Sequence, residues 1–329
     1  MDPSADPPTT RSGHVALVGR PNVGKSTLLN ALVGEKLSIV TPRAQTTRES
    51  VTGILTTPTM QAIFVDTPGL LEPRYVLQRA MHDTALEVLR GADVVVLLLD
   101  VTRPDEVPPA DVVELLMRRQ ESILAVINKM DASSSDAVET LERWCGDHGL
   151  VTLAVSAVDG TGVAELTTEL EARLPAGPFY YPEDELAVQP VRFFVAELIR
   201  ETIFEMYEQE VPYSAIARVE EYREGSDPLF IRATVYVERE SQKPIVIGRG
   251  GAGIRELGRR SREKIEAFVG QRVYLDLRVK ALPNWRSRLG TLRYLGYRLP
   301  ASLAAAPDDP GFPPPGRKRT APRGRRRGE

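Results

Sequence analysis

Two hydrophobic periodicities alternate along residues 13–175. Short runs of consecutive apolar residues have the length of strands, and between them apolar residues recur every three or four positions, as on one face of a helix. Expected strands cover residues 14–18, 61–65, 94–99, 123–127 and 151–155. Expected helices cover residues 26–33, 75–90, 110–119, 137–145 and 163–174. Because continuous apolar strands alternate with helices, this region predicts a mostly parallel sheet with helices on both faces.

A different pattern follows residues 176–190, whose prolines and acidic side chains predict a linker. The apolar spacing then predicts a helix, two alternating strands, a short apolar turn, a glycine-rich turn, a second long helix and a final strand. These elements are expected at residues 192–207, 214–223, 229–238, 244–247, 248–251, 254–269 and 272–280. Their order predicts a separate α+β domain.

The length of 329 residues also favours two domains, because a single core rarely grows beyond about 250–300 residues. From residue 301 onward, Ala, Pro, Gly and Arg dominate, which predicts a disordered basic tail. The expected limits are a disordered N-terminus at 1–12, the first domain at 13–175, the linker at 176–190, the second domain at 191–283, a segment packing on that domain at 284–300, and the tail at 301–329.

The formal net charge is -3, but the charged residues are distributed unevenly along the chain. Residues 1–242 hold 21 Lys and Arg against 38 Asp and Glu, whereas residues 243–298 hold 14 against 4 and residues 299–329 hold 7 against 3. A basic second half predicts contact with a polyanion, although a merely solvated basic surface stays open. Cys145 is the single cysteine, and no apolar run is long enough to span a bilayer, so we expect a cytoplasmic protein.

Residues 19–26 read Gly-Arg-Pro-Asn-Val-Gly-Lys-Ser and fit the phosphate-binding pattern G-x-x-x-x-G-K-[ST] between an expected strand and helix. The glycines let backbone amides surround phosphates at the positive end of a helix. Lys25 would reach the β- and γ-phosphates, and the Ser26 hydroxyl would bind Mg²⁺. The expected nucleotide-binding residues here are Gly19, Arg20, Pro21, Asn22, Val23, Gly24, Lys25, Ser26 and Thr27.

A second motif at the end of the strand 123–127 predicts guanine as the base. The carboxylate of Asp131 can accept hydrogen bonds from guanine N1–H and the 2-amino group, a donor pair that adenine lacks. Ser156 and Ala157, after the next strand, would line the same base. The expected base-site residues are Asn128, Lys129, Met130, Asp131, Ser156 and Ala157.

A third motif, Asp66-Thr67-Pro68-Gly69, also follows an expected strand. Asp66 would hold Mg²⁺ through water, and the Gly69 amide would sense the γ-phosphate. A threonine among residues 41–50 should complete the metal site, and Thr41, Thr46 and Thr47 all qualify. We place Asp66, Thr67, Pro68, Gly69 and Leu70 at the nucleotide, but assign no catalytic residue: Leu70 stands where related enzymes place a glutamine, and an apolar side chain cannot orient water, so hydrolysis should be slow.

The second domain contains Val246-Ile247-Gly248-Arg249-Gly250-Gly251 followed by Ile254, which resembles the G-x-x-G loop of a type II KH domain. Glycines there let an RNA backbone approach closely, and the arginines behind them would receive phosphates. The expected RNA-binding residues are Gly248, Arg249, Gly250, Gly251, Ile254, Arg255, Arg259 and Arg260.

A P-loop GTPase domain followed by a type II KH domain resembles the Era family of bacterial ribosome-assembly GTPases over roughly residues 13–298, including Gln45-Thr46-Thr47-Arg48 and Trp285. The resemblance implies that Thr47 joins Ser26 and Asp66 at the metal, and that Asn22 helps bind K⁺. It implies coupling of GTP and GDP states to KH-domain binding of the 3′ end of 16S rRNA during 30S ribosomal subunit assembly and rRNA processing. It also implies peripheral contact with the cytoplasmic face of the inner membrane, and we expect a monomer.

Two other functions stay open at this point. A tRNA-modification GTPase shares Asn22 and the Thr-Thr-Arg pattern but needs a catalytic site beyond the nucleotide pocket. Cys145 stands alone in an expected amphipathic helix, and the three histidines, His14, His82 and His148, do not cluster, so all four are interpreted as structural. Alternatively, the basic second domain could bind an acidic protein or lipid instead of RNA.

Overall fold

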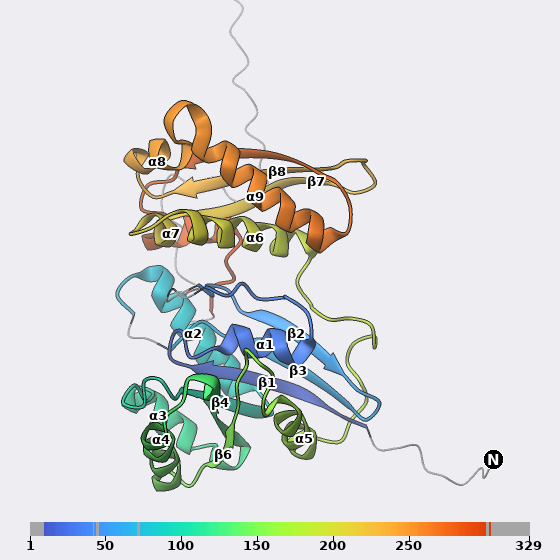
Figure 1. Ribbon diagram of the computed structural model, residues 1–329, viewed down its shortest axis with the longest axis vertical. Coiled ribbons are helices and arrows are strands. Elements are labelled where there is room, and N and C mark those ends of the chain that lie inside the picture. The colour runs from blue at the N-terminus through green and yellow to red at the C-terminus, as the bar shows by residue number, and fades with distance from the viewer. Residues whose placement is uncertain (1–9, 42, 44–45, 71–72, 301–302, 304–329) are drawn as a thin grey trace, which may run out of the picture.

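The computed structural model describes residues 10–300 and 303, except 42, 44–45 and 71–72. The chain forms two lobes, one around a six-stranded sheet and one around a three-stranded sheet (Figure 1). Expectations for residues 1–9, 301–302 and 304–329 lie outside the described residues. Arg11 and Ser12 were assigned to a disordered N-terminus, which is wrong. They begin strand β1, where they pair with Met60 and Gln61.

The larger sheet has the strand order β2-β3-β1-β4-β5-β6. Its strands are β1 (Arg11–Gly19), β2 (Val51–Thr56), β3 (Met60–Asp66), β4 (Val94–Asp100), β5 (Ile123–Asn128) and β6 (Val151–Ala154). All neighbours are parallel except β2, which runs antiparallel to β3 at the edge. The sequence did not predict β2, because Thr52 and Gly53 interrupt its short apolar run and an edge strand needs no continuous one.

Helices cover both faces of this sheet, as predicted (Figure 1). They are α1 (Lys25–Val33), α2 (Val76–Gly91), α3 (Ala110–Met117), α4 (Ser135–Asp147) and α5 (Val163–Arg173). Strand β4 is buried along its whole length, and its side chains alternate between two apolar cores. One core includes α1 and α5, and the other includes α2, α3 and α4.

The smaller sheet has the order β7-β8-β9, with β7 antiparallel and β9 parallel to β8. Its elements are α6 (Val191–Met206), α7 (Val211–Ser214), β7 (Ile216–Arg223), β8 (Leu229–Val237), α8 (Lys243–Ile247), α9 (Ala252–Val269) and β9 (Val273–Ala281). Helices α6 and α9 lie together on one face of the sheet (Figure 1). The expected turn at 244–247 is the short helix α8, and the strand expected from 214 begins at Ile216 after α7.

Short 3-10 turns complete the fold: η1 (Gln120–Ser122), η2 (Met130–Ala132), η3 (Glu240–Gln242), η4 (Arg249–Gly251) and η5 (Trp285–Ser287). After η5, helix α10 (Leu289–Leu295) packs with Trp285 in an apolar cluster that includes both Tyr236 of the smaller sheet and Leu77 of α2. The segment expected to pack on the second domain therefore contacts the first domain as well. Among the described residues, no helix is long and apolar enough to cross a membrane.

Candidate nucleotide site and RNA-binding surface

The phosphate-binding loop joins β1 to the start of α1, at the carboxyl edge of the parallel sheet. Gly24 adopts φ 99°, and a Cβ there would lie 2.2 Å from Nδ2 of Asn128. That amide donates to the carbonyl of Val23 at 2.8 Å, and its Oδ1 accepts the backbone N–H of Ala157 at 3.1 Å. Asn128 thus holds the phosphate loop, its own loop and the 156–157 loop together.

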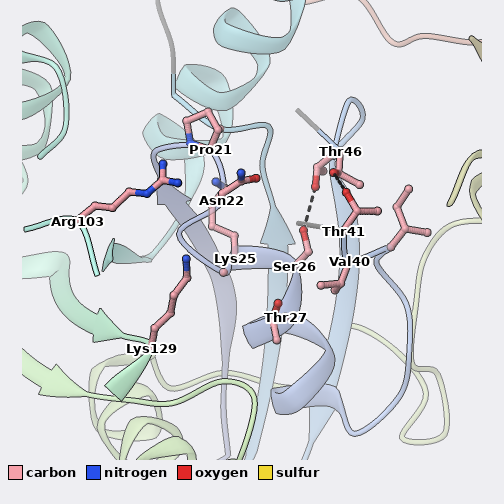
Figure 2. A pocket seen from close by; sticks show the side chains of 14 residues that line it. Pro21, Asn22, Lys25, Ser26, Thr27, Val40, Thr41, Thr46, Arg103 and Lys129 are labelled. Carbon is pink, nitrogen blue, oxygen red and sulfur yellow. Dashed lines mark hydrogen bonds between the residues drawn. The ribbon is translucent and has the colours of Figure 1, made fainter. Parts of the chain in front are cut away.

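A cavity of about 450 Å³ lies above this loop (Figure 2). Lys25 is buried beneath it, with its ammonium group donating to the carbonyls of Gly19 at 3.2 Å and Arg20 at 2.9 Å. Burial lowers the Lys25 pKa to about 8, and the nearby charge of Asp66 only partly opposes this. A buried ammonium group with carbonyl partners alone gains strongly from an arriving polyphosphate.

Oxygen atoms from three segments that are distant in the sequence meet at the N-terminal start of α1. The Ser26 hydroxyl donates to Oδ2 of Asp66 at 2.7 Å and lies 2.9 Å from Oγ1 of Thr47. Oδ1 of Asp66 is buried with no hydrogen-bond partner among the described residues. Burial raises the Asp66 pKa despite the neighbouring charge of Lys25. Hard oxygen donors and an unsatisfied buried carboxylate oxygen fit Mg²⁺.

The three threonines that the sequence offers as metal ligands make different contacts in the structure. Thr47 reaches Ser26, whereas the hydroxyls of Thr41 and Thr46 lie 2.6 Å from each other. Figure 2 shows Thr41 and Thr46 on one side of the cavity, Arg103 and Lys129 on the other, and Ser26 between them. This geometry favours Thr47 as the metal-site threonine.

The base-site residues converge beyond β5. Asp131 is exposed, and its Oδ1 accepts a 2.7 Å hydrogen bond from the Ser156 hydroxyl. Lys129 adopts φ 69°, in the left-handed region, and its ammonium group lies 2.5 Å from Oδ2 of Asp100. The structure therefore brings together residues 128–131 and 156–157, with a fixed carboxylate facing solvent where a base would lie.

Some expected nucleotide-binding residues can contribute only backbone atoms. Val23, Thr67 and Leu70 have buried side chains, and the Thr67 hydroxyl donates to the carbonyl of Leu17. The side chain of Leu70 packs in the core against Ala16, while its N–H donates to the carbonyl of Gly19 at 3.0 Å. Because the apolar core holds this side chain, only the backbone of Leu70 can meet the nucleotide, and its place in the nucleotide site stays a prediction.

Arg103 is a cavity residue that sequence reasoning missed. It follows β4 and lies beside the phosphate loop (Figure 2), with its guanidinium 3.6 Å from Glu106. Glu106 also lies 3.8 Å from Arg20. The available signal was its position just after a buried strand, where ligand-contacting loops of parallel sheets lie.

In the second domain, the glycine-rich loop joins α8 to α9. Arg249 and Arg255 are exposed, and within the described part of the chain neither has a carboxylate at ion-pair distance. Arg255 instead donates to the carbonyl of Gly250 at 2.9 Å. The loop thus presents positive charge next to glycine backbone, as phosphate recognition requires.

Two other expected RNA-binding arginines are less available. Arg259 and Arg260 both donate to Glu256, and Arg259 also donates to Glu263 at 2.7 Å. The hydrogen bonds from Arg259 and Arg260 lower the Glu256 pKa to about 2, so this carboxylate stays charged at neutral pH. Intrahelical pairing of these arginines reduces the charge that they offer to RNA.

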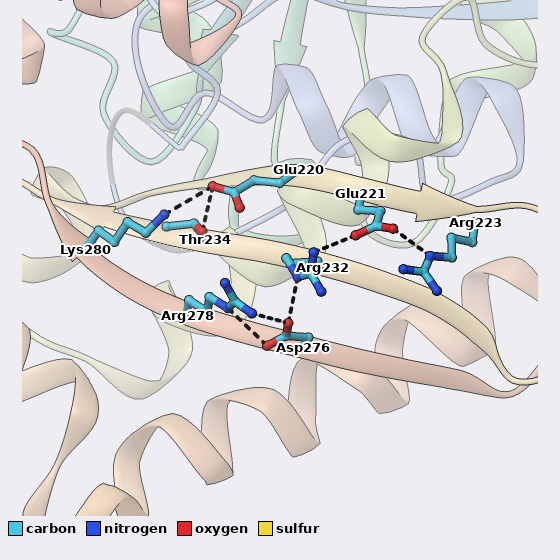
Figure 3. A network of polar contacts seen from close by, with 8 residues as sticks. All are labelled: Glu220, Glu221, Arg223, Arg232, Thr234, Asp276, Arg278 and Lys280. Carbon is cyan, nitrogen blue, oxygen red and sulfur yellow. Dashed lines mark hydrogen bonds and ion pairs between the residues drawn. The ribbon is translucent and has the colours of Figure 1, made fainter. Parts of the chain in front are cut away.

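The face of the smaller sheet opposite α6 and α9 carries a network of paired charges (Figure 3). Arg232 pairs with Glu221 at 2.6 Å and with Asp276 at 2.8 Å. Asp276 also pairs with Arg278 at 2.9 Å, and Lys280 lies 3.7 Å from Glu220. Because its cations already have carboxylate partners, this face is a weaker phosphate acceptor than the glycine-rich loop.

Comparison with known proteins agrees with this two-part description. A family model described as 50S ribosome-binding GTPase matches residues 14–129, and one described as KH domain matches residues 210–286. GTPase Era of Synechocystis sp. is 41% identical over 293 residues, which are 88% of this chain and 93% of that protein. The chain belongs to the Era family of GTPases. The Era of Carboxydothermus hydrogenoformans is 40% identical over 291 residues, 87% of this chain and 98% of that protein.

Solved Era structures have the same fold. Aquifex aeolicus Era bound to GDP and AlF4⁻ superposes with a TM-score of 0.81 at 36% identity, covering 88% of this chain and 100% of that one. Era in complex with MgGDPNP and nucleotides 1506–1542 of 16S ribosomal RNA gives 0.81 at 37% identity, with the same coverage. The predicted fold class, a P-loop GTPase domain followed by a KH domain, is confirmed, and this Era-family chain is a GTPase.

Proposed function

We propose that this Era-family protein binds GTP, hydrolyses it slowly to GDP and phosphate, and couples its nucleotide state to binding of the 3′ end of 16S rRNA by its KH domain. This coupling would act in 30S subunit assembly and rRNA processing. The observation that supports it is the presence, in one chain, of a guanine-type base site and a glycine-rich loop whose arginines have no carboxylate at ion-pair distance among the described residues. A 37% identical relative holds both MgGDPNP and 16S rRNA nucleotides.

At the nucleotide, the chain's contribution is positioning and charge. Lys25 and the loop amides would bind the phosphates, and Asp131 would accept the guanine donors. Ser26, Thr47 and Asp66 would hold Mg²⁺, which neutralises charge on the β- and γ-phosphate oxygens. Because the Leu70 side chain is buried, it cannot orient the attacking water, which supports slow hydrolysis.

RNA binding tests the proposal directly. The affinity of the full chain for an oligonucleotide of 16S nucleotides 1506–1542 is measured with GDP and with a non-hydrolysable GTP analogue. A scrambled oligonucleotide of equal length is the control. We expect tighter binding of the specific RNA in one nucleotide state. Equal affinities in the two states, or negligible binding in both, contradict the proposal.

We also propose K⁺ at the phosphate loop. Asn22 adopts φ 66° and lines the cavity next to Lys25, where an amide oxygen could help hold a monovalent cation beside the phosphates. GTP turnover should be faster in KCl than in NaCl at equal concentration, and Asn22→Ala should remove the difference. Equal turnover in the two salts contradicts this cofactor.

The alternatives from the sequence carry less support. Cys145 is fully buried in α4, and His148 bonds the carbonyl of Trp144 at 2.7 Å, so both have structural roles. The match of a KH domain to residues 210–286 favours RNA over a protein or lipid partner. Peripheral contact with the cytoplasmic face of the cell membrane and a monomeric state stay predictions.

A further inference from the structure

The connection between α6 and β7, residues 207–215, lies between the two functional sites; we call it the bridging segment. On its first-domain side, Arg48 donates from Nη1 to the carbonyl of Ala215 at 2.8 Å. Its Nη2 donates to the carbonyls of Pro212 at 3.0 Å and Tyr213 at 2.9 Å. A second arginine, Arg43, donates to the carbonyl of Tyr207 at 2.5 Å.

Arg48 is held tightly at this contact. It is only 6% exposed, and its guanidinium lies 5.6 Å from the ring centre of Trp285. The planar group satisfies several backbone carbonyls at once, which a lysine at the same position could not do. Moving Arg48 away would leave these carbonyls without their donor, which costs free energy. The bridging segment is therefore expected to move together with Arg48.

On its other side, the bridging segment contacts the helix that carries the RNA loop. The Tyr207 hydroxyl donates to the carbonyl of Val246 in α8 at 2.9 Å. The side chain of Gln242, just before α8, donates to the Ser214 hydroxyl at 2.8 Å. Helix α8 ends at Ile247, immediately before the glycine-rich loop. The same segment therefore holds both Arg48 and the element that positions Gly248.

The residue before Arg48 belongs to the metal site. Thr47 lies 2.9 Å from Ser26, and adjacent Cα atoms are about 3.8 Å apart. Thr47 contacts the phosphate loop while Arg48 contacts the second domain, so the two side chains lead to different sites. A shift of Thr47 towards bound metal and nucleotide must displace Arg48 or strain the backbone between them.

We propose that Arg48 is a positioning residue that transmits occupancy of the GTP site to the RNA loop, along the path Thr47, Arg48, bridging segment and α8. The inference rests on the proposed function and assigns its coupling to these contacts. Coupling between two binding sites is reciprocal, so RNA bound at the loop changes GTP affinity by the same factor through the same path.

The test compares RNA affinities in the two nucleotide states. The readout is the ratio of dissociation constants for the 16S oligonucleotide with GDP and with the non-hydrolysable GTP analogue, a ratio that is typically about 5 to 150 for coupled sites. Arg48→Ala and Arg48→Lys should bring the ratio close to one. GTP-analogue affinity without RNA should change far less than this ratio, because Arg48 does not line the cavity.

Arg119→Ala is the matched control. Arg119 also donates to backbone carbonyls, those of Leu89, Arg90 and Ala92, but it joins elements of the first domain only. Its loss should leave the ratio unchanged. Tyr207→Phe is the second test variant, because it removes one hydroxyl from the far end of the path and keeps Arg48 in place; it should lower the ratio even where Arg48→Ala does not fold.

The outcomes separate the two proposals. A wild-type ratio of one, or no RNA binding, overturns the proposed function itself. A wild-type ratio that differs from one and persists in Tyr207→Phe and in folded Arg48 variants overturns the contact path and leaves the proposed function standing. A ratio that also collapses in Arg119→Ala would show a general loss of stability and overturn the assignment to Arg48.

Discussion

At the scale of residues, we predict that one side chain selects the nucleotide that binds. Asp131 offers a carboxylate held by Ser156, and nothing else among the base-site residues 128–131 and 156–157 can accept two hydrogen bonds from one purine edge. Sites built around a fixed polar partner reject analogues that leave it unpaired. We therefore predict that guanine selection depends on Asp131 and on the hydrogen bond that it accepts from Ser156.

Asp131→Asn should weaken binding of GDP on the order of 100-fold or more and favour xanthosine diphosphate, because an amide donates where the carboxylate accepted. Calorimetric titration with GDP and with xanthosine diphosphate measures the two affinities. Asp136→Asn, an exposed carboxylate in the first turn of α4, is the control and should change neither affinity. Undiminished GDP affinity in Asp131→Asn would remove Asp131 as the base reader.

Leu70 shows that a position and its side chain can have different roles. Leu70→Gln should not accelerate hydrolysis, because the side chain lies in the core; burying the amide should instead destabilise the fold by about 1–3 kcal/mol. Leu70→Met, which nearly conserves volume, should cost less. Thermal unfolding measures the stability of the two variants, and single-turnover GTP hydrolysis measures their rates. A faster Leu70→Gln enzyme of unchanged stability would place this side chain in the cavity.

At the scale of elements, the arginines near helix α9 differ in whether a carboxylate already pairs with them. Arg249 lies in the loop before it and Arg255 in its first turn, both without carboxylate partners in the described structure, whereas Arg259 and Arg260 are paired one turn further on. Counterion release depends on the cations that actually reach phosphates, so position along this helix should matter more than the total count.

Replacing Arg249 and Arg255 together by glutamine should weaken 16S oligonucleotide binding and flatten its salt dependence by about 1.4 in log–log slope. The double change of Arg259 and Arg260 to glutamine is the matched control on the same helix and should have a smaller effect. This contrast should persist from neutral to mildly acidic pH, since the Glu256 pKa is about 2. Equal losses in the two variants would contradict the role of pairing.

For the whole molecule, the buried carboxylate of Glu201 in α6 connects parts that are distant in sequence. It lies 2.8 Å from the ammonium group of Lys36, after α1, and 2.7 Å from that of Lys264 in α9. Burial raises its pKa, but hydrogen bonds and charge from Lys264 and Lys36 outweigh this, so the net pKa lies below its usual 4.5. One side chain thereby ties both domains together.

Glu201→Gln should reduce the free energy of unfolding at neutral pH by about 1–3 kcal/mol, because both lysines lose their shared partner. A depressed pKa stabilises the fold above pH 4.5, and this contribution is lost as pH falls below that value towards the folded-state pKa. The difference in the free energy of unfolding between wild type and Glu201→Gln should therefore become smaller in acid.

Chemical denaturation across this pH range measures the effect. Glu114→Gln, which breaks an exposed pair with Arg118, is the control and should change stability by less than about 1 kcal/mol. A gap that stays constant from neutral to acid pH would show that Glu201 is not charged in the folded protein.

Sequence patterns recovered most elements but not all. Strand β4 was evident because burial on both faces requires an unbroken apolar run, whereas β2 was missed at the sheet edge. The site motifs were evident because phosphate and base recognition use contiguous residues with local backbone geometry. Arg103 was missed, because it carries no motif and reaches the cavity only through the fold.

The sequence by itself determined the predicted chemistry: the phosphate loop, the carboxylate proposed to bind guanine and the glycine-rich loop proposed to bind RNA are short segments recognised by their residue order. The tertiary structure decided which of three threonines meets Ser26, which arginines of α9 are paired with carboxylates, and that Arg48 binds the second domain. These depend on segments far apart in the chain, such as Arg48 and Ala215, whose contact is set by domain packing and leaves no local pattern.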